Sequence, residues 1–225
     1  MTVPRSLLAE FIGTFTLIFA GCGAVVASVG VDSIGLVGIA LAFGIAVAAM
    51  VAATGHISGA HINPAVTLSL LVAGKMKAGK AGAYVLVQLA GAAAAALALR
   101  LLLPPSSWEP VNLGATALAP QISPIAGVAI EAILTFFLVF AIFGTAVDKR
   151  GPGVPIAAFA IGLVVAMDII VGGSFTGGSM NPARSFGPAL VSGAWGDWWV
   201  YLIGPLAGGA IASLTYSKVF LKEPA

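Results

Sequence analysis

The sequence predicts an all-α membrane protein with six transmembrane helices, two re-entrant half-helices and an inverted internal repeat. Three observations support this prediction. The 225 residues are 60% hydrophobic and only 8% charged, whereas soluble domains carry about 25% charged residues. Two Gly-rich bends lead into Asn-Pro-Ala and then into short apolar runs. The two halves of the chain repeat several segments in the same order.

Composition and charge exclude several classes of protein. A formal net charge of +2 gives no strongly basic surface for nucleic acid. The single cysteine, Cys22, excludes an internal disulfide and a Cys-cluster metal site, and its apolar surroundings predict inert packing. No nucleophile–base pair or phosphate-cradling loop indicates an enzyme, so neither catalysis nor a cofactor is predicted.

The apolar stretches predict one membrane domain over residues 1–225. A spanning helix needs about 20 mostly apolar residues. Six stretches meet this requirement: 6–29, 34–54, 82–103, 125–147, 155–172 and 198–220. Two shorter runs, 63–73 and 181–191, follow the Gly-rich bends. They are too short to cross a bilayer, so we expect half-helices that are buried in protein or line a water-filled cavity.

Basic residues collect on one side of this arrangement, which places both termini in the cytoplasm by the positive-inside rule. They are Arg5, Lys75, Lys77, Lys80, Lys149, Arg150, Lys218 and Lys222. The two half-helices then enter the membrane from opposite faces. The proline-rich connection 104–124 is expected to be an extracellular loop.

The two halves of the chain, approximately 1–103 and 125–225, resemble each other. Glu, Thr, Phe, Leu, Phe and Ala recur in register in the segments that begin at Glu10 and at Glu131. Each half contains three spanning helices, an odd number, so the halves have opposite topology in the membrane. Inverted repeats with Gly/Pro-interrupted segments at matching positions place a site at the repeat interface near the bilayer midplane.

The interrupted segments share the motif Asn-Pro-Ala. It is formed by Asn63, Pro64 and Ala65, and again by Asn181, Pro182 and Ala183. Asparagine is a good N-cap, and proline suits the first turn of a helix, where its missing N–H would have no partner. Each Asn has two interpretations, an N-cap that holds the turn and an amide that faces a pore. We expect both roles at once.

These motifs resemble those of the aquaporin (major intrinsic protein) family, and the resemblance covers essentially the whole chain. The opening Ala9-Glu10-Phe11-Ile12-Gly13-Thr14 and the first bend carry it together with the paired Asn-Pro-Ala motifs. The resemblance implies that the half-helices meet tip to tip, with a narrower selectivity filter on the extracellular side. It also implies a homotetramer in the lipid bilayer, with one pore per protomer that passes water and small neutral solutes. Half-helix dipoles and an Arg are the family's established means of excluding protons and cations.

The resemblance places the selectivity filter at Phe43, Ile169, Gly178 and Arg184. An Arg inside a membrane is costly and normally faces a cavity or a partner, so we interpret Arg184 as a filter residue rather than as a side chain that reaches lipid headgroups. Strict water channels carry His where this chain has Ile169, so a wider and more apolar filter is expected. It is similar to the filters of archaeal and some plant vacuolar aquaporins, and we expect a prokaryotic inner membrane.

The predicted function is a passive transmembrane water channel that excludes protons and ions. A broader channel for ammonia, hydrogen sulfide and limited glycerol is the alternative. Glycerol facilitators carry Asp and Lys where this chain has Ser185 and Ala189, and Pro-Leu where it has Tyr201-Leu202, which counts against efficient glycerol conduction. Hypotheses from other classes are a proton-coupled transporter that uses Asp168 and a structural membrane protein with a closed pore.

Three acidic residues lie inside predicted helices, where ionisable groups are candidates for function. We expect Glu10 and Glu131 to accept hydrogen bonds from the backbone of the re-entrant loops, because that backbone needs partners within the protein. Asp168 has two interpretations. One is a carboxylate bonded to the filter loop or to Arg184, and the other is a pH-titrating gate.

Two histidines, His56 and His61, flank the first bend. Neither carboxylates nor cysteines accompany them, so no metal site is predicted. We expect His61 to line the cytoplasmic vestibule and His56 to hydrogen-bond the loop. Since Cys22 is not expected near Arg184, mercury is not expected to block the pore at the filter.

Overall fold

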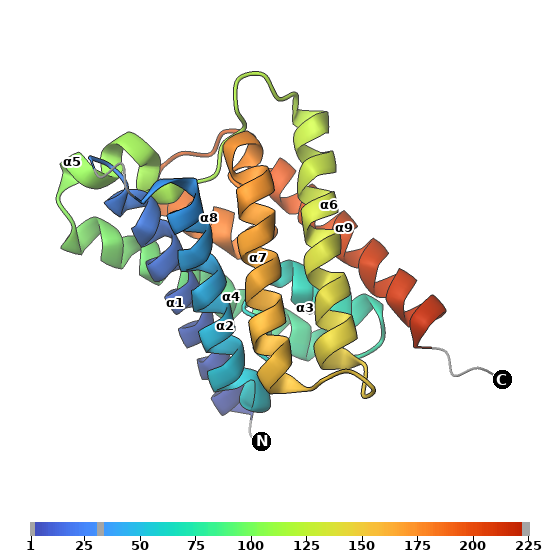
Figure 1. The fold of residues 1–225 in the computed structure, drawn as a ribbon. Helices are drawn as coiled ribbons and strands as arrows, with labels where there is room; N and C mark the ends of the chain where they lie inside the picture. Colours follow the sequence, from blue (N-terminus) through green and yellow to red (C-terminus); the bar gives the residue numbers. More distant parts are fainter. Residues whose placement is uncertain (1–2, 31–33, 222–225) are drawn as a thin grey trace.

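The computed structural model describes residues 3–30 and 34–221, and the described part of the chain is helical without strands (Figure 1). The long helices are α1 (Val3–Ala27), α2 (Gly35–Ser58), α4 (Ala78–Leu102), α6 (Pro124–Ile142), α7 (Val154–Thr176) and α9 (Val200–Thr215). Single π-helical turns extend α6 over Phe143–Val147 and α9 over Tyr216–Phe220. Two short helices, α3 (Pro64–Val72) and α8 (Pro182–Ser192), lie between the long ones. Lys222, one of the basic residues of the predicted cytoplasmic side, lies outside the described residues.

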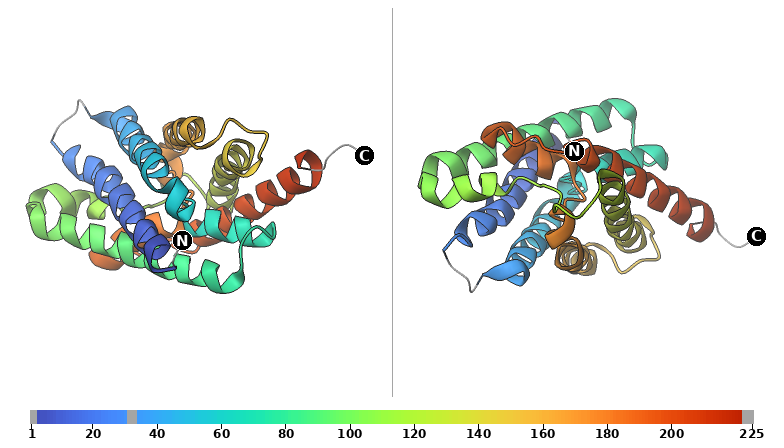
Figure 2. Two further views of the ribbon diagram at one scale, coloured as in Figure 1. Left: turned by 90° about the horizontal axis from the view of Figure 1, so that it is seen from below. Right: turned by 90° about the horizontal axis from the view of Figure 1, so that it is seen from above.

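The long helices have the length and composition of membrane spans. Among the described residues, 6 helices of 21 to 25 residues are apolar enough to cross a bilayer. Large apolar side chains cover their outward faces, and Leu86, Ile125 and Ile211 are each more than half exposed. Figure 2 shows the helices end-on, from below and from above. The predicted all-α membrane fold with two half-helices is confirmed.

Helices pair in the same way in the two halves of the chain. α1 packs on α4, and α6 packs on α9. A Cβ added to Gly91 would lie 2.6 Å from the carbonyl oxygen of Phe11, and one added to Gly208 would meet the carbonyl oxygen of Ala132. Small residues at such crossings let helix backbones approach closely, which favours association in a membrane.

The crossing of α2 and α7 joins the two halves directly. A Cβ on either Gly44 or Gly162 would lie 2.5 Å from the carbonyl oxygen of the other residue. The two backbones are therefore in contact, and the crossing has no room for a side chain. Phe43, next to Gly44, is positioned by this contact.

Two helices continue beyond their predicted ends. α2 ends at Ser58 and α7 at Thr176, each four residues later than the sequence predicts. Apolar length set the predicted ends, but a backbone inside a membrane must also keep its hydrogen bonds. The helices end instead where Gly59 and Gly177 adopt left-handed conformations, with φ of 94° and 82°. Each glycine N–H donates to the carbonyl four residues earlier.

The connection 104–124 contains more structure than the predicted loop. α5 (Pro105–Trp108) is followed by a 3-10 turn, η1 (Glu109–Gly114). Within η1, Leu113 has a left-handed φ of 56° and is fully buried. The chain therefore turns into the interior at this point, where Gly114 is buried.

The half-helices lie on opposite sides of the bundle, with α3 in the lower half of Figure 1 and α8 in the upper half. Each begins at the proline of its motif, Pro64 or Pro182, and each preceding Asn is an extended N-cap. The side-chain oxygens of Asn63 and Asn181 accept hydrogen bonds from the N–H two residues later, at 2.7 and 2.9 Å. These caps let an apolar helix begin inside the protein, because they satisfy N–H groups that would have no partner.

Candidate functional site

The two bends that precede α3 and α8 have matching backbone conformations. Left-handed residues occur as three pairs: Gly59 and Gly177, Ala60 and Gly178, and Ile62 and Met180. A left-handed conformation is unusual for a β-branched residue such as Ile62, whose φ is 44°. Strain of this kind persists only where the surrounding structure holds it. In this protein, two buried glutamates hold the two strained bends in place.

Glu10, on α1, holds the first bend. Its carboxylate accepts hydrogen bonds from the N–H groups of His61, at 2.9 Å, and Ile62, at 2.7 Å. Gln88 on α4 donates to the same carboxylate at 2.8 Å and to the hydroxyl of Thr67 at 3.0 Å. Glu10 is fully buried, and these partners replace the water that its charge loses. Sequence reasoning missed Gln88, although a polar residue inside an apolar helix was a signal.

Glu131, on α6, has the matching position at the second bend. It accepts from the N–H groups of Ser179, at 2.9 Å, and Met180, at 2.7 Å. The hydroxyl of Thr176 donates to it at 2.7 Å. The carboxylates of Glu10 and Glu131 thus bind the same two backbone N–H positions in the two bends.

The two Asn side chains link the bends to each other. Nδ2 of Asn63 donates to the carbonyl oxygen of Met180 at 2.8 Å, and Nδ2 of Asn181 donates to that of Ile62 at 3.0 Å. An Asn amide carries two N–H donors, so each amide keeps one for another acceptor. The N-termini of α3 and α8 consequently come together, and each contributes a partial positive charge of about half an elementary charge.

A cavity of about 190 Å³ lies beside the two bends and is lined by the two Asn side chains. The predicted site residues that line it are Phe43, Asn63, Ile169, Gly178, Asn181 and Arg184. The other motif residues, Pro64, Ala65, Pro182 and Ala183, are buried in the first turns of α3 and α8. The cavity therefore collects residues from both halves of the chain around one space.

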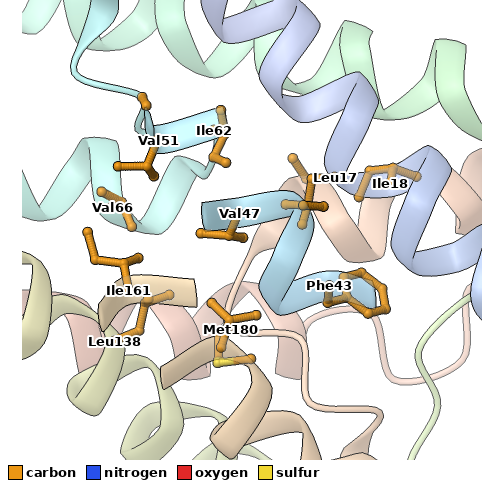
Figure 3. Packing of buried hydrophobic residues seen from close by; sticks show 14 of the residues in the cluster. Leu17, Ile18, Phe43, Val47, Val51, Ile62, Val66, Leu138, Ile161 and Met180 are labelled. Atoms are coloured by element: carbon orange, nitrogen blue, oxygen red, sulfur yellow. The ribbon is translucent and has the colours of Figure 1, made fainter. Parts of the chain in front are cut away.

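Much of the remaining lining is apolar. It includes Val47, Val51, Val66, Leu138 and Ile161, which come from α2, α3, α6 and α7. Figure 3 shows these side chains gathered around a common space. They offer no hydrogen bonds, so a molecule of water in the cavity must bond to the bends, the two Asn amides or Arg184.

Arg184 is 5% exposed. Its Nη1 donates to the carbonyl oxygen of Gly114 at 2.6 Å, and its guanidinium carbon lies 4.9 Å from the ring centre of Phe43. Nε has no hydrogen-bond partner among the described residues. The burial excludes the alternative in which Arg184 reaches lipid headgroups. Gly114 was missed, because it acts through a backbone carbonyl that no sequence motif marks.

Cys22 lies beside Arg184, which corrects the expectation of a filter without a cysteine. Its Sγ is 3.6 Å from Nη1 of Arg184 and 3.9 Å from the carbonyl oxygen of Gly114. The thiol is fully buried and does not line the cavity. No sequence signal was available, because Cys22 and Arg184 are 162 positions apart.

Asp168 is fully buried on α7, and neither of its carboxyl oxygens has a hydrogen-bond partner among the described residues. The expected bond to the filter loop or to Arg184 is therefore wrong. Burying an ionised carboxylate without a partner is costly. The pH-titrating gate stays a prediction.

The two histidines differ in their surroundings. His61 lines the cavity, and its Nδ1 lies 3.1 Å from the hydroxyl of Thr67. His56 is exposed at the end of α2 and makes no side-chain hydrogen bond to the bend. In the described part of the chain, no group of three or more His, Cys, Asp or Glu is placed to hold a metal ion.

A cavity between paired half-helices is a feature that can be compared with known proteins. The family model described as "Major intrinsic protein" matches residues 1–216. The chain belongs to the major intrinsic protein family, the aquaporins. It is 44% identical to aquaporin TIP4-4 of Zea mays over 97% of this chain and 88% of that protein. It is 42% identical to aquaporin TIP2-1 of Arabidopsis thaliana over 96% of this chain and 88% of that protein.

Two further comparisons extend this result. Aquaporin NIP1-4 of Oryza sativa subsp. japonica is 42% identical over 98% of this chain and 78% of that protein. Among solved structures, the aquaglyceroporin from Plasmodium falciparum matches with a TM-score of 0.86 and 26% identity over 97% of each chain. The sequence comparisons and the structure comparison therefore both indicate the aquaporin fold.

Family membership makes this aquaporin a multi-pass membrane channel and not an enzyme. Relatives named TIP aquaporins fit the predicted water-channel branch. The expected prokaryotic inner membrane is corrected, because it conflicts with relatives that come from Zea mays, Arabidopsis and Oryza.

Proposed function

We propose that this aquaporin is a passive water channel whose pore runs between the tips of α3 and α8 and excludes protons and ions. One observation carries the proposal: two Asn amides and Arg184 line a cavity whose remaining walls are largely apolar. Relatives named as aquaporins support water as the cargo. They do not favour the alternative of a broader channel for ammonia, hydrogen sulfide and limited glycerol.

Proton exclusion follows from the free N–H of each Asn amide. One N–H of Asn63 and one of Asn181 are committed to the opposite bend, and the second can donate to the oxygen of a passing water. A water that accepts from both amides points its hydrogens away from the midplane and cannot relay a proton there. The positive ends of α3 and α8 add a field that opposes any cation.

The proposed selectivity filter consists of Phe43, Ile169, Gly178 and Arg184. Arg184 is held by Gly114 and lies over Phe43, so its charge stays at one place and repels cations. Ile169 and Gly178 offer no side-chain donors, and only Arg184 and backbone groups can hydrogen-bond to water here. The filter is therefore expected to be less polar than a filter that carries His at the position of Ile169.

The assembly and orientation are part of the same proposal. We expect inverted repeats of approximately 1–103 and 125–225, a homotetramer with one pore per protomer, and both termini in the cytoplasm. The matching contacts of Glu10 and Glu131 support the repeat. The outward apolar faces leave ample surface for lipid and for neighbouring protomers.

Stopped-flow light scattering on proteoliposomes tests the proposal. An impermeant osmolyte should cause rapid shrinkage with a low activation energy, glycerol should enter slowly, and a proton gradient should persist. Ile169→His should leave water flux high and lower ammonia flux, with Ile169→Val as the matched control. Permeability equal to that of empty liposomes would overturn the water-channel assignment.

A further inference from the structure

The first bend carries a chain of side-chain hydrogen bonds that ends at the wall of the pore. Nε2 of Gln88 donates to the carboxylate of Glu10 at 2.8 Å and to the hydroxyl oxygen of Thr67 at 3.0 Å. The same hydroxyl lies 3.1 Å from Nδ1 of His61. Gln88 and Thr67 are fully buried, whereas His61 lines the pore cavity. The chain of bonds therefore connects the interior of the helix bundle to the pore.

The carboxylate of Glu10 fixes the orientation of the Gln88 amide. It accepts from two backbone N–H groups as well as from Gln88, and a carboxylate has no hydrogen to donate. The group of Gln88 beside it must therefore be the amide NH2. This orientation leaves only the amide oxygen without a partner among the described residues. The opposite orientation would place that oxygen against the carboxylate and leave both buried N–H donors unpaired.

The hydroxyl of Thr67 consequently accepts from Gln88, and its own hydrogen needs an acceptor, because buried polar groups are normally paired. In the described part of the chain, the hydrogen-bond partners of this hydroxyl are Gln88 and His61 alone. The hydrogen therefore points at Nδ1 of His61, which must be unprotonated to accept it. A neutral imidazole that accepts at Nδ1 carries its proton on Nε2.

The second bend has the same pattern of hydroxyl bonds. Thr116 donates to the hydroxyl of Ser185 at 2.8 Å, and the hydroxyls of Ser185 and Ser179 are 2.7 Å apart. Ser179 donates to a backbone carbonyl at 2.9 Å, so the hydrogen between the two serines comes from Ser185. Ser185 and Ser179 occupy the positions of Thr67 and His61 relative to the motif Asn. In both bends, the hydroxyl that follows the motif thus donates back to the residue that precedes it.

We propose that Gln88 is a positioning residue that acts through Thr67 and holds His61 in the Nε2–H tautomer. Nε2 lies beside Gly59, where an added Cβ would be 3.1 Å from it, and Gly59 and His61 both line the cavity. The ring thus directs Nδ1 toward the buried hydroxyl and Nε2–H toward the cavity. This inference rests on the proposed function and deepens it. The N–H donates to a water oxygen and has no lone pair that could take a proton from the file of water.

Nitrogen NMR of the two imidazole rings tests the tautomer directly. The protein is labelled at the histidine ring nitrogens, reconstituted in proteoliposomes and measured at mildly alkaline pH, where histidine is ordinarily neutral. The chain contains two histidines. His56 is exposed and serves as the internal reference. The variants are Gln88→Met, which removes the donor, Thr67→Val, which removes the hydroxyl, and Thr67→Ser, which keeps it.

In the wild type, the Nε2–H form of His61 should exceed the Nδ1–H form by about tenfold or more, because the other form leaves a buried hydroxyl hydrogen unpaired. Gln88→Met lets the Thr67 hydroxyl turn toward Glu10, which bonds to the same nitrogen in the wild type. The excess of the Nε2–H form should then fall about fivefold. Thr67→Val should shift the Nδ1 resonance of His61, Thr67→Ser should restore it, and the signals of His56 should not move.

Comparable amounts of the two forms in the wild type, or a ratio that Gln88→Met leaves unchanged, would overturn the proposal. If Gln88→Met does not fold, the wild-type ratio and the two Thr67 variants decide. An Nδ1 resonance that stays in place in Thr67→Val would show that the bond from Thr67 to His61 does not exist. The tautomer is measured without water flux, so a failure of the proposed channel function appears separately, in the stopped-flow experiment.

Discussion

The sulfur of Cys22 lies 3.6 Å from Nη1 of Arg184, and both contact the carbonyl oxygen of Gly114. A thiol on the first helix is therefore in contact with the charged group of the proposed filter. Any atom added to that sulfur must compete with the guanidinium for the same space. The position of Arg184 thus depends on α1 and on the connection 104–124 as well as on its own bend.

Mercury chloride is expected to inhibit water flux through Cys22. Mercury bound to Sγ would displace the guanidinium of Arg184 toward the pore, and inhibition should develop slowly because the thiol is fully buried. Stopped-flow shrinkage of proteoliposomes measures the effect, and added thiol should reverse it. Cys22→Ser should conduct water normally and resist mercury. Equal inhibition of Cys22→Ser would show that mercury acts elsewhere.

Glu131→Ala is expected to destabilise the second bend. The change leaves the N–H groups of Ser179 and Met180 without their acceptor, at a cost of roughly 1–3 kcal/mol for each buried donor. Thermal unfolding in detergent should show a clear loss of stability, and water flux should fall because Asn181 and Arg184 follow this bend. Glu109→Gln, at an exposed position, is the matched control. A Glu131→Ala protein as stable as wild type would contradict the role in holding the loop.

Gly162→Ala is expected to separate α2 from α7. The new Cβ would lie 2.5 Å from the carbonyl oxygen of Gly44, and overpacking of this kind costs about 1–3 kcal/mol. Gly79→Ala makes the same change on α4, where nothing lies within 4 Å of the added Cβ, so it should be neutral or slightly stabilising. Unfolding temperatures of the two variants provide the test, and equal values would refute the close crossing.

Asp148 should make the contact between the α6–α7 connection and the end of α9 depend on pH. Hydrogen bonds from the Arg150 side chain and backbone hold the pKa of this carboxyl well below its ordinary value. Arg150 also donates to the carbonyl oxygen of Phe220. The carboxylate therefore stabilises the contact above its unfolded pKa of about 3.9, and this stabilisation is lost as pH falls through the lowered folded pKa.

Hydrogen exchange of residues 148–153 and 216–220 measures this dependence. Protection should be constant from neutral pH down to about pH 4 and decline below it. Asp148→Asn should show weaker protection at neutral pH and no decline in acid. Exchange in wild type and Asp148→Asn that follows the same pH profile would exclude Asp148 as the titrating group.

The helices and the Asn-Pro-Ala motifs could be predicted from the sequence, whereas some helix ends and the surroundings of Asp168 could not. Apolar length predicted the spans, and the Asn-Pro-Ala pairs predicted the half-helices, because both signals are local. The ends of α2 and α7 were placed four residues early, because apolar length alone does not show that a membrane-embedded backbone keeps its hydrogen bonds until Gly59 and Gly177. The expected partner of Asp168 was wrong, because a buried position does not reveal what lies opposite it.

The sequence by itself determined the membrane class and the six spans, because composition and apolar length follow directly from what a bilayer tolerates. Its paired Asn-Pro-Ala motifs carried the repeat and the resemblance to the family. Only the tertiary structure decided that Asn63 bonds to Met180 and that Gly114 and Cys22 hold Arg184. These contacts join residues far apart in the chain, often through a backbone carbonyl. Their geometry depends on how whole helices pack, and no local pattern of residue types encodes it.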